Sequence, residues 1–317
     1  MELTKRILAA GIRIRPHIRK TPLENAFTFS KEAGCNLFLK LENMQYTGSF
    51  KARGAINRLI LLDPEEKKTG VVTASTGNHG LATAYGLGQL GIPGTIFLPL
   101  NASSEKIAMF EPFDVDLEFF AKDCGETESH AREQAKKRGK VYISPYNDPD
   151  VIAGQGTIGL EIIDQLDGVD CIMASVGGGG LISGIAAMVK AIKTDVKVIG
   201  CLPEQSPVMY DSVRAGRIVS STPGPTISDG TAGGIEKNSI TLNPCKNLVD
   251  DWILVSEEEI RTAMKLVFER QRLVIEGAAG VAVAAFLKTC RHLEKKTVAV
   301  VICGGNIDPD LFKSIVC

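Results

Sequence analysis

The sequence lacks the long apolar segments that would place it in a membrane. None of its hydrophobic runs approaches the roughly 18 to 20 residues that a helix needs to cross a bilayer. Its first residues, Met-Glu-Leu-Thr-Lys-Arg, contain no apolar core of the kind that a secretion signal requires. We therefore expect a cytoplasmic protein with no membrane as a partner.

The sequence also lacks an excess of charge of either sign. Lys and Arg number 36 and Asp and Glu number 37, which gives a formal net charge of −1. Proteins that bind nucleic acid gain much of their affinity by releasing counterions from phosphates, which requires a basic surface. Because no block of basic residues occurs here, we do not expect nucleic acid as a partner.

Cysteines at metal-binding spacing are missing as well. The chain has eight cysteines, but no two of them form a Cys-x-x-Cys or similar close motif, and the four histidines complete none. In a long chain without a secretion signal, cysteines are usually free and buried as small hydrophobic residues. The sequence predicts no metal site.

Short apolar runs alternate with helical patterns along most of the 317 residues, a length that suggests about two domains. Several runs, such as Val298–Ile302, are continuous in β-branched residues, which is typical of parallel strands covered on both faces. The alternation predicts an α/β protein with doubly wound, mostly parallel sheets. We expect strands at Asn36–Leu41, Val71–Ser75, Thr95–Leu98, Val115–Phe120, Lys140–Ser144, Cys171–Val176, Lys197–Cys201, Trp252–Val255 and Thr297–Ile302. We expect helices at Phe50–Leu62, His79–Leu90, Ser104–Phe110, Glu126–Arg138, Val151–Leu166, Leu181–Lys193, Pro207–Ala215, Glu257–Gln271 and Gly277–Cys290, and exposed connections at Asp63–Lys68 and Ser221–Pro225.

Glycine is abundant, with 32 residues, and three glycine-containing loops follow predicted strands directly. They are Ser75–Gly80, Ser175–Leu181 and Cys303–Asn306. In open α/β sheets, ligands bind beyond the carboxyl ends of the strands, where all three loops would lie. Ser75–Gly80 also precedes an apolar helix, whose free N–H groups suit an anion, although a helix cap with a glycine turn is the alternative.

Gly177, Gly178, Gly179 and Gly180 form a run that leaves every backbone N–H free to approach a phosphate. A Walker motif would need Gly-Lys-Ser or Gly-Lys-Thr, whereas Leu-Ile-Ser follows here. The dinucleotide spacing Gly-x-Gly-x-x-Gly fails too, which disfavours an oxidoreductase. The loop therefore predicts a smaller phosphorylated cofactor.

Lys51, in the motif Thr47–Gly54, is the candidate reactive group. Most lysines are exposed, but this one follows Gly-Ser-Phe, which predicts a helix start capped by Ser49. The helix start and the like charge of Arg53 would both lower the pKa of Lys51. A neutral amine at this position could form a Schiff base.

These residues resemble the fold-type-II pyridoxal-phosphate enzymes, specifically the serine/threonine dehydratase and serine racemase group. The resemblance covers essentially the whole chain and implies a cofactor in the cleft between two domains, a large one of residues 1–65 and 147–317 and a small one of residues 66–146. The family also suggests a homodimer. The resemblance rests on motifs that occur in the family's order: Lys40–Glu42, Thr47–Gly54, Ser75–Gly80, Ile152–Thr157, Val176–Gly180, Glu276–Gly280 and Cys303–Asn306.

The resemblance implies a role for each candidate site residue. Lys51 would hold pyridoxal 5′-phosphate as a Schiff base and then act as the base on Cα of an amino-acid substrate. Phe50 would pack under the cofactor ring, Asn78 would bond its 3′ oxygen, and Cys303 would face its nitrogen. Two sets complete the site: Gly177, Gly178, Gly179 and Gly180 for the phosphate, and Ser75, Thr76, Gly77 and His79 for the substrate carboxylate.

The implied activity is an ammonia-lyase reaction. A β-hydroxy amino acid such as threonine or serine would lose water, and the released product would hydrolyse to a 2-keto acid and ammonia. 3-Hydroxyaspartate and phenylserine stay open as substrates. A neutral Cys303 thiol would not keep the ring nitrogen protonated, which suits elimination better than a long-lived negative charge on Cα. A racemase is the alternative, with Thr76 where racemases carry a catalytic serine, and a non-catalytic metabolite binder is disfavoured because Lys51 and Asn78 are retained.

Two further expectations concern regulation. Leu202 and Val208 stand where racemases of this group carry metal-binding carboxylates, and apolar side chains cannot bind a divalent cation, although Glu204 lies nearby. Only a few residues follow the last glycine loop. We therefore expect neither a divalent-metal site nor the regulatory domain through which isoleucine inhibits biosynthetic threonine dehydratases.

Overall fold

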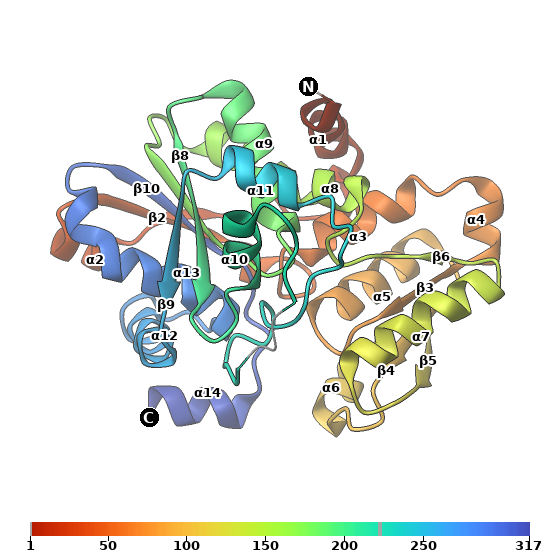
Figure 1. Ribbon diagram of the computed structural model, residues 1–317. Helices are drawn as coiled ribbons and strands as arrows, with labels where there is room; N and C mark the ends of the chain where they lie inside the picture. The colour runs from red at the N-terminus through yellow and green to blue at the C-terminus, as the bar shows by residue number, and fades with distance from the viewer. Residues whose placement is uncertain (1, 221–223) are drawn as a thin grey trace.

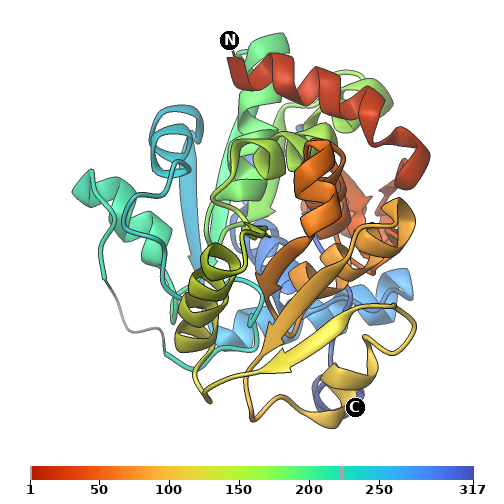
Figure 2. The ribbon, with the colours of Figure 1, turned by 90° about the vertical axis from the view of Figure 1, so that its right-hand side faces the viewer.

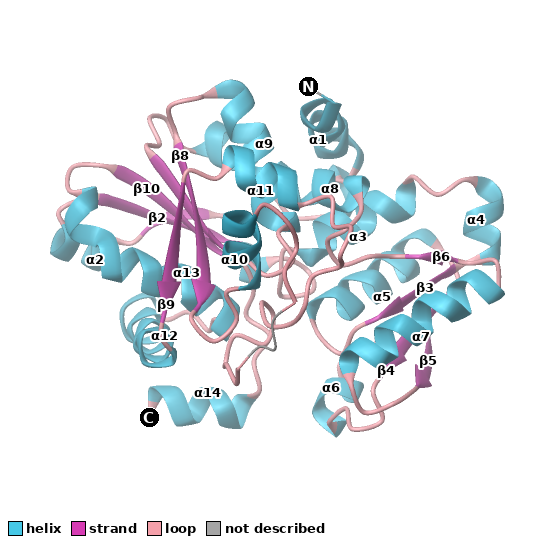
Figure 3. Ribbon diagram, viewed as in Figure 1, coloured by secondary structure: helices cyan, strands magenta, loops and turns pink. Residues whose placement is uncertain are grey.

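The computed structural model describes residues 2–220 and 224–317, so the predicted connection Ser221–Pro225 lies mostly outside the described residues. Two separate sheets, each flanked by helices, make up the molecule (Figures 1 and 3). The larger sheet has six strands, and all neighbouring strands pair in parallel except β1 with β2. In spatial order its strands are β1 (Leu23–Asn25), β2 (Asn36–Leu41), β10 (Thr297–Ile302), β7 (Cys171–Ser175), β8 (Lys197–Pro203) and β9 (Asp251–Val255).

The smaller sheet has four strands that are all parallel. In spatial order they are β5 (Asp116–Phe119), β4 (Gly94–Leu98), β3 (Val71–Ala74) and β6 (Val141–Tyr142). The predicted α/β class with two mostly parallel sheets is therefore confirmed. All nine predicted strands are present with ends within two residues of the prediction, whereas β1 was missed because it is a short, half-exposed edge strand.

Helices cover both faces of each sheet. One face of the larger sheet packs against α13 (Gly277–Thr289), with α12 (Glu257–Gln271), α14 (Pro309–Val316) and α2 (Phe27–Ala33) around it, as Figure 1 shows. The other face carries α9 (Gly180–Ile192), followed outward by α8 (Pro149–Gln165), α1 (Glu2–Arg13) and α11 (Leu242–Leu248). The smaller sheet is flanked by α5 (Asn78–Leu90) and α7 (Cys124–Lys137). The remaining helices are short: α4 (Pro64–Thr69), α6 (Ser104–Ala108), α10 (Val208–Ala215), η1 (Arg15–His17), η2 (Glu42–Met44) and η3 (Cys290–Leu293).

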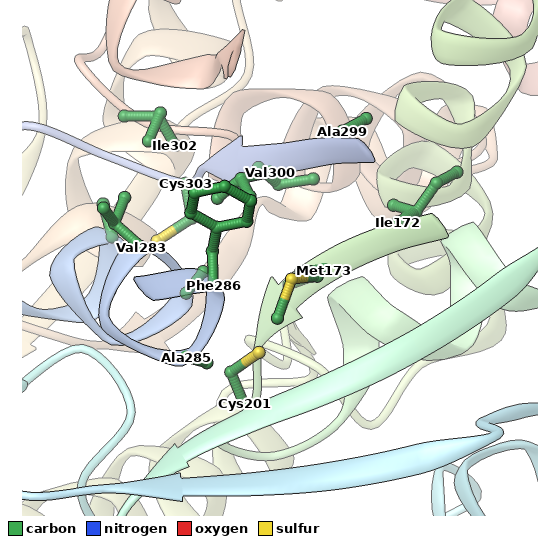
Figure 4. Packing of buried hydrophobic residues seen from close by; sticks show 14 of the residues in the cluster. Ile172, Met173, Cys201, Val283, Ala285, Phe286, Ala299, Val300, Ile302 and Cys303 are labelled. Atoms are coloured by element: carbon green, nitrogen blue, oxygen red, sulfur yellow. The ribbon is translucent and has the colours of Figure 1, made fainter. Parts of the chain in front are cut away.

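The main hydrophobic core lies between the central strands of the larger sheet and α13. Phe286 of α13 is buried against Met173 of β7 and Val300 of β10 (Figure 4). Burying apolar surface contributes roughly 25 cal/mol per Å² to stability, so this layer anchors the strands that end at the glycine loops. Cys201 and Cys303 belong to the same core. All eight cysteines are free and five are buried, as the sequence predicted, whereas Cys290 is half-buried and Cys124 and Cys317 are exposed.

Helix α3 (Lys51–Ile60) connects the two sheets, because it packs against α8 on one side and α5 on the other. Its anchor is Arg53, whose guanidinium is fully buried and pairs with Glu42 at 2.7 Å and Glu161 at 2.6 Å. Lys40, also fully buried, donates to Glu161 at 2.6 Å. This network fixes the first turn of α3, where Lys51 lies.

The predicted exposed connection Asp63–Lys68 instead forms most of α4. Asp63 accepts a hydrogen bond from the backbone of Glu66, and the Glu66 side chain accepts one from the backbone of Asp63. This reciprocal capping box, with proline at the first helical position, supplies the start signal that makes a short helix stable. Among the residues described, no helix is both long enough and apolar enough to cross a membrane.

Candidate active site

Lys51 is the first residue of α3, and its side chain is half-buried between the sheets. The preceding residues pair with the third glycine loop: Phe50 N–H donates to Cys303 O at 3.0 Å, and Gly305 N–H donates to Gly48 O at 2.9 Å. This pairing brings the start of α3 next to the end of β10. The Lys51 ammonium donates to Pro145 O at 3.0 Å.

Burial lowers the pKa of Lys51 to about 8, and the neighbouring Cys303 and Glu276 oppose this shift. The prediction that Arg53 contributes by like charge is wrong, since its guanidinium turns to Glu42 and Glu161, which neutralise it. The lysine expected to be reactive therefore has an amine that is neutral in a large fraction of molecules near pH 8.

Ser49 does not cap α3, contrary to the prediction. It forms an isolated antiparallel bridge with Gly304, and Phe50 occupies the position before the helix. The Ser49 hydroxyl is buried and has no hydrogen-bond partner in the part of the chain that the structure describes. The backbone of Ser49 pairs with Gly304, so its side chain does not form the capping hydrogen bond that the motif predicts.

A buried polar cluster lies beside Lys51 at the ends of β10 and α13. Asn78 donates through Nδ2 to both carboxylate oxygens of Glu276 at 2.9 Å, and its Oδ1 accepts from Asn306 Nδ2 at 2.7 Å. Cys303 Sγ lies 3.8 Å from Glu276 Oε1 and accepts from Ser175 Oγ at 3.4 Å. The structure thus places Asn78 and Cys303 in one hydrogen-bonded group.

The electrostatics of this cluster keep Cys303 neutral. Burial raises the pKa of the Cys303 thiol well above its ordinary value, and nearby Glu276 adds to the shift. Burial also raises the pKa of Glu276 to about 7, and the hydrogen bond from Asn78 opposes this rise. Glu276 therefore changes charge near neutral pH.

The glycine loop runs from β7 into the first turn of α9. Gly179 has φ of +84°, a left-handed conformation that glycine adopts without strain. A Cβ atom at Gly178 would collide with the ring of Tyr146, and one at Gly180 would lie 3.0 Å from Tyr146 Cβ. Glycine is thus required for Tyr146 to cover the loop, and backbone N–H groups of the first turn of α9 remain for a phosphate.

The loop Ser75–Gly80 forms the start of α5. Ser75 Oγ accepts from Gly77 N–H at 3.2 Å, and Gly77 is the residue before the helix. No atom lies within 4 Å of the position that a Cβ on Gly77 would take, so this backbone borders open space. Thr76 is half-buried beside it. An open helix start with hydroxyl groups on either side suits a carboxylate.

The ring of His79 occupies a different environment from its neighbours. It is buried, and its Nε2 lies 2.9 Å from Ile143 O. Burial and the positive charge of Lys51 lower the pKa of His79 to about 3, so the ring is neutral at physiological pH. Its backbone N–H, in the first turn of α5, is the group of this residue that remains suited to an anion.

Sequence reasoning missed three residues that the fold adds to this site. Glu276 directly precedes an apolar helix rich in glycine and alanine, and it is buried together with that helix. An acidic residue next to such a helix is a sequence signal for a buried functional group. Asn306 ends the third glycine motif, and the motif alone does not show that its side chain bonds to Asn78. Tyr146 carries no local signal, because its contact with the glycine loop joins two distant segments.

Comparison with known proteins identifies the family. A model described as pyridoxal-phosphate dependent enzyme matches residues 14–304. The chain belongs to this family. The predicted relation to the serine/threonine dehydratase group is confirmed, and pyridoxal 5′-phosphate is the cofactor of the enzyme.

Relatives with known activities and structures agree with this assignment. The chain is 41% identical to the L-threonine ammonia-lyase of Thermotoga maritima over 300 residues, which cover 94% of this chain and 74% of the relative. The structure resembles a processed threonine deaminase from Solanum lycopersicum, with a TM-score of 0.95, 33% identity, and coverage of 99% and 91% of the two chains. It also resembles maize serine racemase, with a TM-score of 0.92, 32% identity, and coverage of 98% and 96%. The protein is a pyridoxal-phosphate-dependent lyase.

The residues present fit the cofactor. Lys51 offers an amine with a lowered pKa, and the glycine run offers free N–H groups at the start of α9. The polar cluster around Asn78 and Cys303 lies beside the same lysine. Groups suited to a covalent bond with the cofactor, to its phosphate and to its polar ring therefore lie close together.

Proposed function

We propose that the enzyme is an ammonia-lyase that eliminates water from a β-hydroxy amino acid such as L-threonine or L-serine. The enamine that it releases then takes up one water and yields a 2-keto acid and ammonia. The observation that carries this proposal is the position of Lys51 between the glycine loop, the start of α5 and the Cys303 cluster. The 41% identity to an L-threonine ammonia-lyase supports threonine as the first substrate to test.

Four parts of the site would hold the cofactor. Lys51 would bind it covalently, Phe50 would pack under its ring, and Asn78 would donate to the 3′ oxygen. Gly177, Gly178, Gly179 and Gly180 would donate to the phosphate. Pyridoxal phosphate, when bound, supplies an electron-accepting ring that stabilises the charge left when a proton leaves Cα.

The substrate carboxylate would bind at the start of α5. Ser75 and Thr76 supply hydroxyl groups, and Gly77 and His79 supply backbone N–H groups at the positive end of the helix. This position would direct Cα toward Lys51, whose amine takes the α-proton. That proton would pass on to the β-hydroxyl, which leaves as water.

Cys303 would set the balance between elimination and racemisation. A carboxylic acid beside the ring nitrogen would keep that nitrogen protonated and the ring strongly electron-accepting, whereas a neutral thiol would not. Negative charge on Cα would therefore be short-lived. Departure of the β-hydroxyl relieves that charge at once. Elimination is therefore favoured over return of the proton to the opposite face.

A racemase is the second candidate. Thr76 keeps a hydroxyl next to Gly77, and maize serine racemase shares the fold with a TM-score of 0.92. The extra methyl of threonine restricts its χ1 rotation, which would limit proton transfer from that side.

The family relation also supports a proposal on domain motion and assembly. Residues 66–146 would form a small domain that closes on substrate against a large domain of residues 1–65 and 147–317, which would exclude water. The active enzyme would be a cytoplasmic homodimer.

Borohydride reduction tests the proposal directly. The purified holoenzyme is reduced, digested and mapped by mass spectrometry, and we expect one cofactor adduct, on Lys51. Release of 2-keto acid is then compared for threonine, serine, 3-hydroxyaspartate and phenylserine. An adduct on another residue, or inverted amino acid without keto acid, would contradict the proposal.

A further inference from the structure

Two consecutive residues after β6, Pro145 and Tyr146, contact different parts of the active site. Pro145 O accepts from the Lys51 ammonium at 3.0 Å, and the ring of Tyr146 covers Gly178 and Gly180. Ser144 Oγ accepts from Asn147 N–H at 3.0 Å, which closes the turn. We call residues 144–147 the site turn. The position of the site turn therefore determines where the hydrogen-bond acceptor of Lys51 lies and how the Tyr146 ring packs on the glycine loop.

Glu236 holds the site turn from outside. Its backbone N–H donates to Tyr146 Oη at 2.9 Å, and its side chain accepts from Asn147 Nδ2 at 2.8 Å. Asn147 Oδ1 in turn accepts from Ile240 N–H at 2.9 Å. Residues 235–240 lie between α10 and α11. Their hydrogen bonds therefore hold Tyr146 and Asn147 of the site turn in place.

The carboxylate of Glu236 is itself fixed by Arg132 of α7 at 2.7 Å. The guanidinium of Arg132 lies 4.1 Å from the ring centroid of Tyr142 in β6, four residues before Tyr146. Figure 2 shows α7 beside the teal segment that leads to α11. The ion pair thus joins the smaller sheet to the segment that fastens the site turn.

We propose that Glu236 is a positioning residue that holds Tyr146 over the glycine loop and thereby tightens cofactor binding. The proposal rests on the proposed function in one respect, since it takes this loop to bind the cofactor phosphate. Glu236 touches no group that we propose to bind cofactor or substrate. In this proposal it nevertheless controls the affinity for the cofactor.

Two variants and a matched control test the proposal. Glu236→Gln removes the charge that pairs with Arg132, and Tyr146→Phe removes the hydroxyl that accepts from Glu236 while it keeps the ring. The control is Glu128→Gln, because Glu128 also pairs with Arg132, at 2.8 Å, but lies on α7 itself. Each apoenzyme is titrated with pyridoxal 5′-phosphate, and the dissociation constant is measured by equilibrium dialysis.

We expect Glu236→Gln and Tyr146→Phe each to weaken cofactor binding by about five- to tenfold, the effect of losing one or two charged or half-buried hydrogen bonds. The double variant should bind no more weakly than the weaker single variant, because the Arg132–Glu236 pair and the Glu236–Tyr146 hydrogen bond act in series on the same ring. Raising the salt concentration should weaken binding more in the wild-type protein than in Glu236→Gln, since salt screens a half-exposed pair.

The results separate this inference from the proposed function. A dissociation constant of Glu236→Gln within twofold of that of Glu128→Gln overturns the inference, as does full additivity in the double variant. If the wild-type apoenzyme itself fails to bind pyridoxal 5′-phosphate, the proposed function fails first. If Glu236→Gln does not fold, Tyr146→Phe gives the same comparison.

Discussion

Asn78 and Glu276 form the central polar contact of the active site: both carboxylate oxygens lie 2.9 Å from the same amide nitrogen. This contact decides which end of the Asn78 amide is the donor. Asn306 fixes the other end by donating to Oδ1 at 2.7 Å. A buried acid thus orients the residue that we expect to meet the cofactor ring.

Replacement of Glu276 by glutamine should flatten the pH dependence of stability. Because the pKa of Glu276 is raised to about 7 in the folded protein, the folded state holds a proton that the unfolded state has lost above about pH 4.5. Stability should therefore fall as pH rises from about 4.5 to 7, by up to about 3 kcal/mol, and level off above that. Urea unfolding of the apoenzyme at several pH values measures this slope, which Glu276→Gln should lose.

Attachment of the cofactor should follow the titration of Lys51. The pKa of this amine is lowered to about 8, and only the neutral form attacks an aldehyde. The rate at which apoenzyme binds pyridoxal phosphate should rise with pH, reach half its maximum near pH 8, and then level off. Lys51→Arg keeps a positive charge but should show no covalent attachment, and attachment in that variant would contradict the assignment.

Replacement of two glycines of the site by alanine should affect different properties of the enzyme. Gly178→Ala forces a Cβ into the ring of Tyr146, so we expect a stability loss of about 1 to 3 kcal/mol and cofactor binding weakened by about tenfold or more. Gly77→Ala meets no atom within 4 Å, so folding and cofactor affinity should stay unchanged. The second change should instead raise KM for the amino acid. Thermal melts and steady-state kinetics of both variants check this contrast.

The buried network beneath α3 should be essential for stability. Arg53→Met leaves Glu42, which is fully buried, without its partner, and breaking such a pair typically costs about 3 to 5 kcal/mol. The control is Lys20→Met, which breaks an exposed pair with Asp164 and should cost about 1 kcal/mol or less. Equal shifts of the urea midpoint in the two variants would show that the network does not anchor α3.

Thr76→Ser tests the second candidate function. If the methyl group limits proton transfer, its removal should raise the yield of inverted amino acid without raising that of keto acid. Chiral chromatography of unreacted serine measures the first product, and a keto-acid assay measures the second. An unchanged ratio of the two products would show that Thr76 does not restrain racemisation.

Much of the fold could be predicted because the signals are local. Continuous β-branched runs such as Val298–Ile302 require burial on both faces, and glycine loops directly after strands must lie at the carboxyl edge of a sheet. The short strand β1 carried no such run. The charged composition of Asp63–Lys68 favours an exposed connection, but its capping box starts the helix α4 instead.

The active site could be predicted only in part, because several of its contacts join distant segments. Ser49 matched a capping motif, but its backbone pairs with Gly304, which lies far along the chain. Arg53 lies near Lys51 in sequence, yet its charge is directed to Glu42 and Glu161. Tyr146 meets Gly178 only because two sheets pack together. Local patterns cannot show such contacts.

The glycine loop has one consequence for the handling of the enzyme. The residues that a Cβ on its glycines would meet first, Tyr146, Thr231, Met209, Cys245 and Thr241, are all uncharged. A bound phosphate carries roughly −1.5 to −2 charges at neutral pH, and none of these neighbours cancels them. Loading the cofactor should therefore make the net charge of the protein clearly more negative than its formal −1. Apoenzyme and holoenzyme should separate on an anion-exchange column or in a native gel.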